Sequence, residues 1–433
     1  MRKKIIVTIA IILAMIVAQF SVFINCVKAE TITGSDGDVS WSFNTETQTL
    51  TFSGSGEITS SYKDILSEFE IKHVVINEGI TSIGYCAFLG HVFSERICTD
   101  TIEDVEIPNS VVSIGESAFE RCKSLKKIEI PGSVNSIGEV AFLYCMGLNN
   151  IEVDESNSEY SSENGVLFSK DKNILICCPA GKSGSYQIPD IVTNVEAYAF
   201  AGCEGLTDVE IPNSVTSIGN GAFIWCENIS KITIPNSVTS MQPFAFLLDN
   251  GSNSNENLKI YCKSDSSAKQ YAEENNIPYV VDDTAPTVNL TQDGNSITVE
   301  ATDNEGGAGL SSKAYSLDGE NWQSSNKFEV TKSGTYTIYV KDKLYNIANK
   351  TIDVTISEPS DDKGGSTSEN QDNGNKKESS DGQGQDNNVE TKSDDSQAKT
   401  NIQDTGAYFP IAIIAIAGAI CIIRGIKYRK NKF

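Results

Sequence analysis

Short apolar segments recur at a fixed spacing through the middle of the chain. The phrase "IPNSVVSIG" begins at Ile107, "IPNSVTSIG" at Ile211 and "IPNSVTS" at Ile234. Aligned on this phrase, the units step by 23 residues, as from Ile107 to Ile130. Each unit reads apolar-x-apolar, then Pro, then Val-x-x-Ile-Gly, and finally Ala-Phe-x-x-Cys. A repeat of this length is typical of a leucine-rich-repeat solenoid, in which every coil contributes one strand.

The same pattern predicts the strand, the turn and the core positions of each coil. In "LTDVEIPNSVTSIGNGAFIWC" the alternating trio 209–211 predicts a short strand, which Pro212 ends. Val215 and Ile218 are expected to point inward from the return segment, and Gly219 is expected to allow a tight bend.

Repetition of this register predicts ladders of like side chains inside the solenoid. One aromatic column is expected from Phe88, Phe119, Phe142, Phe200, Phe223 and Phe246. A second column is expected from Ile83, Ile114, Ile137, Val195, Ile218 and Met241. Apolar periodicity of this kind marks a core, not a cofactor site.

The full pattern Ile-Pro-x-x-Val-x-x-Ile-Gly-x-x-Ala-Phe-x-x-Cys resembles the BspA-type leucine-rich repeat family of bacterial surface proteins. The resemblance implies a mainly β solenoid over residues 30–283. Residues 41–58 resemble the N-terminal β-cap of that family, 163–189 a variant coil with an extra hairpin, and 266–281 a closing helix plus strand. A solenoid needs such caps because its end coils would otherwise expose the core.

Residues 284–357 are expected to form a separate β-sandwich. Alternating stretches such as "SITVEA" and "GTYTIYVKD" predict six or seven short strands, and Asp318-Gly319 predicts a hairpin turn. "TAPTVNL" and "YNIANKTIDVTI" resemble bacterial immunoglobulin-like (Ig-like) domains.

The two ends of the chain carry export and anchoring signals. Residues 1–29 have the basic, apolar, small-residue order of a signal peptide, with cleavage expected after Ala29; an uncleaved anchor is the alternative. Residues 358–403 are polar, contain no aromatic residue and are expected to be a disordered spacer. Residues 407–423 are apolar and a basic tail follows them, which predicts a transmembrane helix with a cytoplasmic C-terminus.

A short sequence before that apolar run resembles a sorting signal. Ile402-Gln403-Asp404-Thr405-Gly406 is similar to the sortase signal Leu-Pro-x-Thr-Gly, although Gln403 replaces the proline. The resemblance implies cleavage between Thr405 and Gly406 and covalent attachment to peptidoglycan, with sortase as a partner. A plain membrane anchor is the alternative.

Charge and composition narrow the range of partners. The net charge of −24 argues against nucleic acids and anionic membrane surfaces, which need a basic face. The two histidines, His73 and His91, have no second histidine at a metal-binding spacing, so no zinc site is predicted. We predict no catalytic residue, no metal site and no cofactor.

Four of the eleven cysteines occupy one repeat position: Cys122, Cys145, Cys203 and Cys226. Neighbouring coils lie about 4.8 Å apart, so distance alone permits bridges between Cys122 and Cys145 or between Cys203 and Cys226. A small apolar group also suits this inward position, and we expect buried free thiols.

The middle residue of each strand trio is expected to point outward onto the sheet face. Four glutamates occupy this position: Glu106, Glu129, Glu152 and Glu210. Carboxylates about 4.8 Å apart repel one another, and folding does not require them. They are either a merely soluble face or an acidic stripe that binds a basic protein segment or divalent cations.

The sequence therefore indicates a cell-surface binding or adhesion protein that presents a solenoid to an extracellular protein or glycan. The family resemblance implies adhesion. A secreted hydrolase of wall or glycan and a passive structural surface protein are the alternatives.

Overall fold

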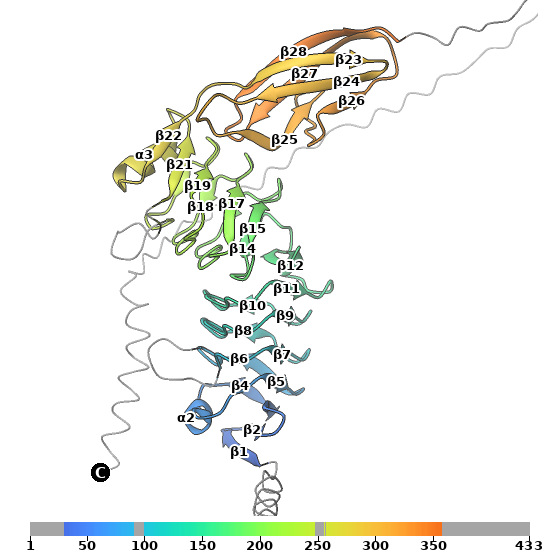
Figure 1. The fold of residues 1–433 in the computed structure, drawn as a ribbon. Helices are drawn as coiled ribbons and strands as arrows, with labels where there is room; N and C mark the ends of the chain where they lie inside the picture. The colour runs from blue at the N-terminus through green and yellow to red at the C-terminus, as the bar shows by residue number, and fades with distance from the viewer. Residues whose placement is uncertain (1–29, 91–98, 247–254, 256, 357–433) are drawn as a thin grey trace, which may run out of the picture. The chain divides into compact units, whose positions relative to one another are not determined.

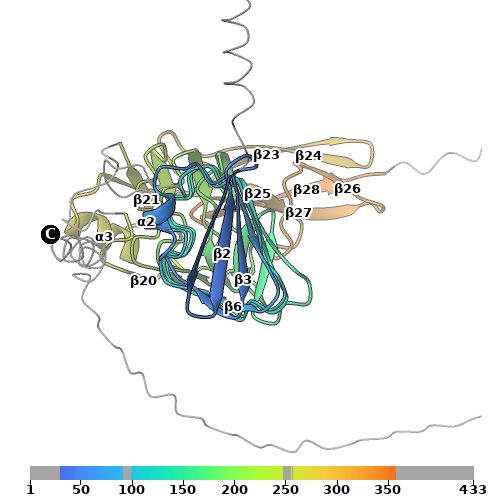
Figure 2. The same cartoon turned by 90° about the horizontal axis from the view of Figure 1, so that it is seen from below.

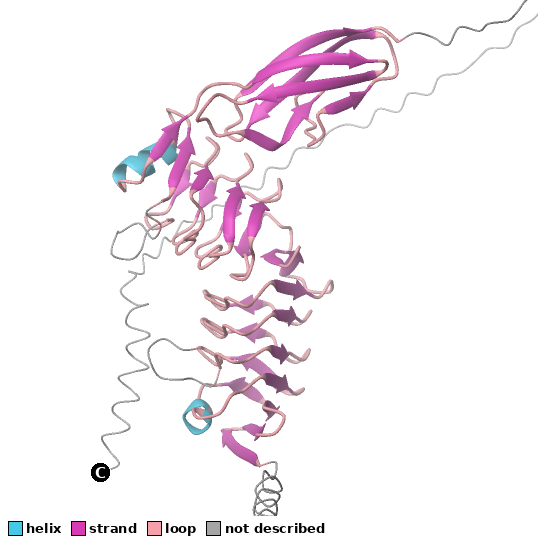
Figure 3. Ribbon diagram, in the orientation of Figure 1, coloured by secondary structure: helices cyan, strands magenta, loops and turns pink. Residues whose placement is uncertain are grey.

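The computed structural model describes residues 30–90, 99–246, 255 and 257–356. The described chain is mainly β, as expected, with two short helices among its strands. The solenoid is a stack of coils that runs from β1 to β22 (Figures 1 and 3). Figure 2 shows this stack from its N-terminal end, with the cap strands β2 and β3 in front of the coils.

The N-terminal cap covers the first coil with an antiparallel meander. It consists of β1 (Thr31–Asp36), β2 (Val39–Asn44), β3 (Thr49–Gly54), β4 (Gly56–Ile58) and helix α2 (Lys63–Leu66). β1, β2 and β3 pair antiparallel, and β3 then pairs parallel with the first coil strand. Trp41, Phe43 and Phe52 point from this meander into the core, which confirms the predicted β-cap.

Two rows of parallel strands run along the coils. The first row contains the predicted trios: β5 (His73–Ile76), β7 (Asp104–Glu106), β9 (Lys127–Ile130), β11 (Asn150–Val153), β15 (Gly184–Gln187), β17 (Leu206–Glu210), β19 (Lys231–Thr233) and β21 (Lys259–Cys262). The second row contains the return segments: β6 (Ile80–Ile83), β8 (Ser113–Ile114), β10 (Ser136–Ile137), β14 (Ile174–Cys177), β16 (Asn194–Val195), β18 (Ser217–Ile218) and β20 (Ser240–Met241). Equivalent residues pair in register, as Ile114 with Ile137 and Val195 with Ile218, so the repeat alignment is confirmed.

A variant coil interrupts both rows. β12 (Tyr160–Glu163) and β13 (Val166–Ser169) form an extra antiparallel hairpin, which begins at Tyr160, before the predicted start of the variant coil at Glu163. β13 then pairs antiparallel with β14, so the second row continues from a new edge. The buried side chains accordingly form two hydrophobic clusters, which divide at Val166 and Leu167.

The single aromatic column that the sequence predicts is wrong: the structure has two stacks. Phe88, Phe119 and Phe142 stack nearly parallel, with centroids 5.2 and 5.8 Å apart. The other stack has centroid distances of 4.9 and 5.0 Å and contains Phe200, Phe223 and Phe246. In the described part of the chain no ring contact joins Phe142 to Phe200. The hairpin of the variant coil separates these two coils, and the C-terminal stack begins on Tyr186, 5.9 Å from Phe200.

The glycine of the repeated phrase is required by packing between coils. A turn begins at Gly219, whose carbonyl accepts a hydrogen bond from the backbone of Ala222 at 3.4 Å, although the backbone of Gly219 itself is not left-handed. A Cβ placed on it would lie 2.5 Å from the backbone nitrogen of Ala197 in the preceding coil, and one on Gly115 would lie 2.7 Å from the carbonyl carbon of Gly84. The expected bend is therefore present, and glycine is needed in it because neighbouring backbones approach closely.

At the repeated position, Cys145, Cys203 and Cys226 are free thiols, as expected, and neither a Cys122–Cys145 nor a Cys203–Cys226 bridge forms. Each Sγ–H donates to a backbone carbonyl of the preceding coil: Cys122 to Phe88 at 3.1 Å, Cys145 to Phe119 at 3.0 Å and Cys226 to Phe200 at 3.1 Å. The position thus takes a small side chain that fills space and also supplies a weak donor.

The predicted helix and strand close the solenoid. They are α3 (Ser267–Glu274) and β22 (Tyr279–Val281). The Oγ of Ser266 accepts a hydrogen bond from the backbone of Lys269 and so caps α3. Tyr271 then packs edge-on against Phe246 at 6.1 Å, which covers the end of the aromatic stack.

Residues 287–354 form two three-stranded antiparallel sheets. β23 (Thr287–Asp293), β24 (Ser296–Thr302) and β26 (Lys327–Glu329) make one; β25 (Leu310–Ser316), β27 (Gly334–Asp342) and β28 (Ile347–Val354) make the other. Ile297 and Val299 of the first sheet and Ile338 and Val340 of the second are buried. Asp318 and Gly319 lie in a turn, where Gly319 has a φ of +79° and the Asp318 carboxylate accepts backbone hydrogen bonds.

Several expectations fall on residues that the structure does not describe. They are the signal peptide 1–29, the spacer 358–403, and the anchor 404–433 with Thr405 and Gly406. None of the helices in the described ranges is both long enough and apolar enough to cross a membrane.

Candidate functional site

Three of the four predicted stripe residues lie together on the first row of strands. Glu106 on β7, Glu129 on β9 and Glu152 on β11 are all exposed, as the alternation of buried and outward residues in each strand requires. Glu129 and Glu152 are direct partners in the parallel pairing of β9 with β11. The three carboxylates form the acidic stripe, a name used below for this set alone.

A lysine reduces the repulsion within the acidic stripe. The Lys127 Nζ lies 2.8 Å from Glu129 Oε1 and 2.6 Å from Glu152 Oε2. Hydrogen bonds to Glu129 and then to Glu152 raise the pKa of Lys127, and its ammonium in turn lowers the pKa of Glu152, with Asn150 contributing. Lys127 therefore occupies the position between two neighbouring carboxylates where a divalent cation would otherwise bind.

The fourth predicted residue, Glu210, is separate from the stripe. It lies on β17, and its Oε1 accepts hydrogen bonds from the hydroxyl of Ser311 at 2.8 Å and from the backbone of Ser312 at 3.1 Å. Its carboxylate therefore holds β25 of the C-terminal sheets against the solenoid.

Other polar contacts join the same two regions. Lys343 pairs with Asp208 at 2.7 Å, Lys313 pairs with Asp190 at 2.7 Å, and Lys231 donates to the carbonyl of Ala308 at 2.7 Å. The C-terminal part of the outward face is thus occupied by the chain itself.

A cavity of about 320 Å³ remains beside these contacts, and we call it the junction cavity. The solenoid contributes Asp190, Glu210 and Ser214 to its wall, and the C-terminal sheets contribute Trp322, Lys341 and Tyr345, among others. The hydroxyl of Tyr345 accepts a hydrogen bond from the backbone of Asn213 at 3.0 Å.

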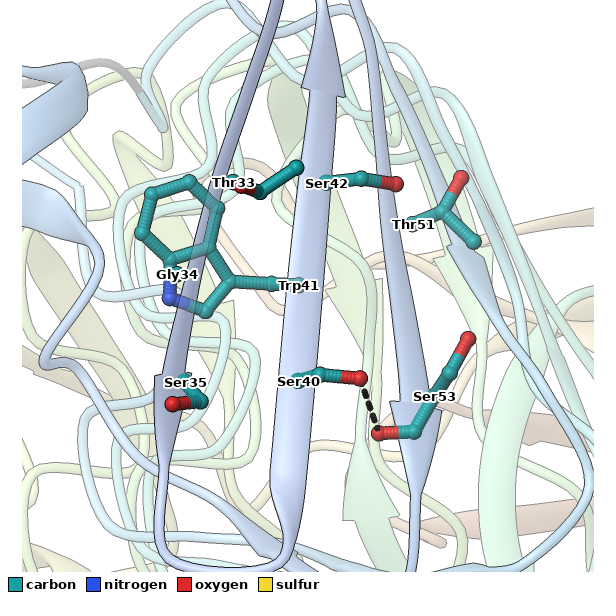
Figure 4. Close-up of a pocket in the computed structure, with 8 residues that line it drawn as sticks. All are labelled: Thr33, Gly34, Ser35, Ser40, Trp41, Ser42, Thr51 and Ser53. Atoms are coloured by element: carbon teal, nitrogen blue, oxygen red, sulfur yellow. Dashed lines mark hydrogen bonds between the residues drawn. The ribbon is translucent and has the colours of Figure 1, made fainter.

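A second hollow, of about 430 Å³, lies on the outer face of the N-terminal cap (Figure 4). Small hydroxyl side chains of the three cap strands line this hollow, and the buried ring of Trp41 lies across Gly34. The hydroxyl of Ser40 donates to the carbonyl of Ser53 at 3.3 Å. All eight lining residues lack a group that titrates near neutral pH, so this hollow has no acid or base of its own.

Three aspartates converge where β22, β24 and β27 end. One carboxylate oxygen from each of Asp282, Asp303 and Asp342 lies within 4.8 Å of the others, and Asp282 and Asp342 are buried. Oxygen ligands of this kind suit Ca²⁺ or Mg²⁺. Backbone N–H groups of Ala308 and Gly309 already donate to Asp282 and Asp303 at 2.8 and 2.6 Å. The cluster therefore joins the loops of the two regions through hydrogen bonds of its own.

Comparison with known families agrees with the repeat pattern. A model described as "BspA type Leucine rich repeat region" matches in six copies over residues 8–95, 91–174 and 180–272, which together are more than half of the chain. The chain belongs to the BspA-type leucine-rich repeat family. A comparison with curated proteins gave no match.

Solved leucine-rich repeat structures are similar to this BspA-type chain. A leucine-rich repeat protein from Eubacterium ventriosum is 24% identical, with a TM-score of 0.36, over 54% of this chain and 80% of that one. A leucine-rich cell surface protein from Faecalibacterium prausnitzii is 21% identical, with a TM-score of 0.27, over 55% and 90%. The pneumococcal vaccine antigen PcpA is 18% identical, with a TM-score of 0.30, over 59% and 99%.

The sequence of this BspA-type chain does not predict the aspartate cluster or the junction cavity. Asp282 and Asp303 follow β22 and β24, Asp342 is the last residue of β27, and no spacing rule relates the three. Lys341 lies on β27 like any strand residue, and the pattern does not show that it is 5% exposed beneath the rings of Trp322 and Tyr345. His73, in contrast, is accounted for as the first residue of β5, where its Nδ1 lies 2.7 Å from Asp104 Oδ2.

The aspartate cluster of this BspA-type chain predicts an unusual pH dependence of stability. Burial raises the pKa of Asp342 from 3.8 to about 6; repulsion from Asp303 and Asp282 adds to the shift, and hydrogen bonds from Asn346 oppose it. Below pH 4 this carboxyl is protonated in folded and unfolded chains alike. Between about pH 4 and 6 the unfolded chain loses the proton while the folded chain keeps it, so rising pH lowers the free energy of unfolding.

Ionisation of Asp342 lowers the free energy of unfolding by at most about 3 kcal/mol, since each pKa unit corresponds to about 1.36 kcal/mol. This full loss is reached above pH 6. Urea unfolding of the wild type and of Asp342→Asn between pH 4 and 7 measures it. In the variant, the free energy of unfolding is expected not to fall between pH 4 and 6 on account of this residue. An equal dependence of the free energy of unfolding on pH in the two proteins would contradict a raised pKa at Asp342.

Proposed function

We propose that this BspA-type protein is a cell-surface binding protein, with the acidic stripe as its contact face for a basic protein segment. The observation that carries the proposal is the arrangement of Glu129 and Glu152, exposed and adjacent on an open strand row and held by Lys127. Repeat scaffolds bind partners on extended surfaces of this kind. Lys127 holds the carboxylates of Glu129 and Glu152 in fixed orientations, so a basic segment would bind carboxylates that are already positioned.

The placement at the cell surface rests on the sequence of the two ends. Residues 1–29 act as the signal peptide and residues 404–433 as the anchor, with sortase cleavage between Thr405 and Gly406. In this proposal residues 284–357 are an Ig-like domain that carries the solenoid above the spacer.

The protein is proposed to act as a binding protein and not as an enzyme. The carboxylates of the acidic stripe lie on an open face, and Lys127 keeps Glu152 ionised, whereas hydrolysis by a carboxylate pair needs one acid with a raised pKa. A matrix-protein and glycan array probed with the full chain and with residues 30–357 tests the proposal. Turnover of an arrayed glycan or peptide would favour the hydrolase, and no binding at all would favour a passive surface component.

Charge reversal within the acidic stripe is expected to weaken capture of the basic partner about tenfold or more. Glu129→Lys with Glu152→Lys replaces two attractive charges by two repulsive ones, while the exposed positions keep the effect on stability within about 1 kcal/mol. Glu300→Lys, an exposed reversal on β24, is the matched control and should bind as the wild type does. Surface plasmon resonance at about 0.15 M salt measures the binding. If the double variant binds as tightly as the wild type, the acidic stripe is not the contact face.

A further inference from the structure

The junction cavity contains a buried cation without an acceptor. Lys341 is 5% exposed, and its Nζ lies 4.4 Å from the centroid of the Trp322 ring and 4.2 Å from that of Tyr345. No residue in the described ranges accepts a hydrogen bond from this ammonium, which has three donors. Burial lowers the pKa of Lys341, and the nearby Asp190 and Glu210 oppose that shift.

The two acids on the solenoid side of the cavity are already paired. Glu210 accepts from Ser311 and Ser312, and Asp190 accepts from Lys313. Both carboxylates therefore have partners other than Lys341.

A hydroxyl on the same wall also lacks a partner. The Oγ of Ser214 is buried and makes no hydrogen bond within the described residues. In the N-terminal coils the equivalent hydroxyls do bond, as Ser110 to the carbonyl of Ile80 at 2.7 Å and Ser133 to that of Val111 at 2.6 Å. The hydroxyl of Ser237, at the same position of the next coil, also lacks a partner within the described residues, but it does not line the cavity. Within the part of the chain that the structure describes, the Lys341 ammonium and the Ser214 hydroxyl lack acceptors together at the junction cavity. A buried donor without an acceptor costs about 1–3 kcal/mol, so a ligand that supplies oxygen atoms here gains affinity.

We propose that the junction cavity binds a saccharide unit that carries a carboxylate, with the carboxylate on Lys341. This inference rests on the proposed binding function and names a ligand class for a second site of the same protein. A volume of about 320 Å³ falls at the small end of ligand sites, which suits one sugar ring better than a folded protein loop. Trp322 and Tyr345, which hold the Lys341 ammonium over their rings, also line the cavity, and Ser214 and Asn321 on the wall offer polar atoms to the hydroxyls of the sugar.

Calorimetry on the full chain with four probes tests the proposal: glucuronate, glucose, acetate and a tetraglutamate peptide. Glucuronate is expected to bind at least tenfold more tightly than each of the other three. Equal binding of glucose shows that the carboxylate is not recognised, and equal binding of acetate shows that the sugar ring is not. Tighter binding of the peptide assigns the cavity to acidic protein segments. Each of these results, and the absence of glucuronate binding, overturns the proposal.

Variants locate the site. Lys341→Gln is expected to weaken glucuronate binding roughly 10–100-fold, because it removes charge-assisted hydrogen bonds. Ser214→Ala removes a hydroxyl that makes no hydrogen bond within the described residues, so it preserves the fold and is expected to weaken binding about 2–10-fold. Lys327→Gln, an exposed lysine on β26, is the control and should leave binding unchanged. If Lys341→Gln does not fold, Ser214→Ala decides, and wild-type affinity in that variant overturns the site.

The test separates this inference from the proposed function. Glu129→Lys with Glu152→Lys changes residues outside the junction cavity and should leave glucuronate binding intact while it weakens capture of the basic partner. If the full chain binds a partner on the array but does not bind glucuronate, the inference about the junction cavity is wrong and the proposed function stands.

Discussion

Replacement of Phe119 by alanine is expected to lower the free energy of unfolding by about 3–5 kcal/mol. Phe119 is fully buried, and its ring lies between those of Phe88 and Phe142, at 5.2 and 5.8 Å and within 10° of parallel. Alanine removes both ring contacts and leaves a cavity that the paired strands on either side cannot close. Each coil contacts only its neighbours, so the lost packing affects the coils on either side of Phe119, in the middle of the N-terminal hydrophobic cluster.

Urea unfolding followed by circular dichroism measures this loss. Phe119→Leu keeps most of the volume and is expected to cost about 1–1.5 kcal/mol. Val112→Ala, on the return segment of the same coil, is the control, because Val112 is 42% exposed and its change should stay within about 0.5 kcal/mol. A cost below about 1 kcal/mol for Phe119→Ala would mean that the aromatic stack does not stabilise the coil.

The sequence predicts the coils well because each one repeats the same local requirements. Val209 and Ile232 are buried, and Glu129 and Glu152 face outward as partners, since a strand alternates its side chains and the period fixes its register. The register says nothing about how far a ladder continues. The variant coil is recognisable in the sequence, but its effect, two aromatic stacks and two core clusters, depends on the hairpin β12–β13 and its pairing with β14.

Two features lie beyond any single-coil pattern. Glu210 has the same place in its coil as Glu129, yet it bonds to Ser311, because the C-terminal sheets pack on that part of the face. Lys341 and Ser214 are far apart in the sequence and meet only across the junction cavity. The solenoid and the C-terminal sheets do not share a sequence repeat, so no alignment of repeats predicts which of their residues come into contact.

The thiols of the folded chain are expected to react far more slowly than ordinary cysteines. Burial raises the pKa of Cys177 from 9.0 to about 12, so its thiolate fraction near pH 8 is roughly a thousandfold below that of a free thiol. Burial also raises the pKa of Cys145 and of Cys226. Pairing of Cys122 with Cys145 would remove the hydrogen bonds that each Sγ–H donates to the carbonyl of Phe88 or Phe119.

Alkylation with iodoacetamide at pH 8, followed by peptide mapping, measures the rate at each cysteine. Cys122, Cys145, Cys203 and Cys226 are expected to react only as the chain unfolds, and Cys177 roughly a thousandfold more slowly than the same cysteine in urea. The urea-unfolded chain is the control, in which all of them should react at the rate of a free thiol. Peptide mapping also resolves Cys26, Cys98 and Cys421, so their reaction cannot be mistaken for that of the ladder. A Cys122–Cys145 or Cys203–Cys226 disulfide in the unreduced map would contradict the free-thiol ladder, because an interior in which each thiol donates to a carbonyl has no need of the bond.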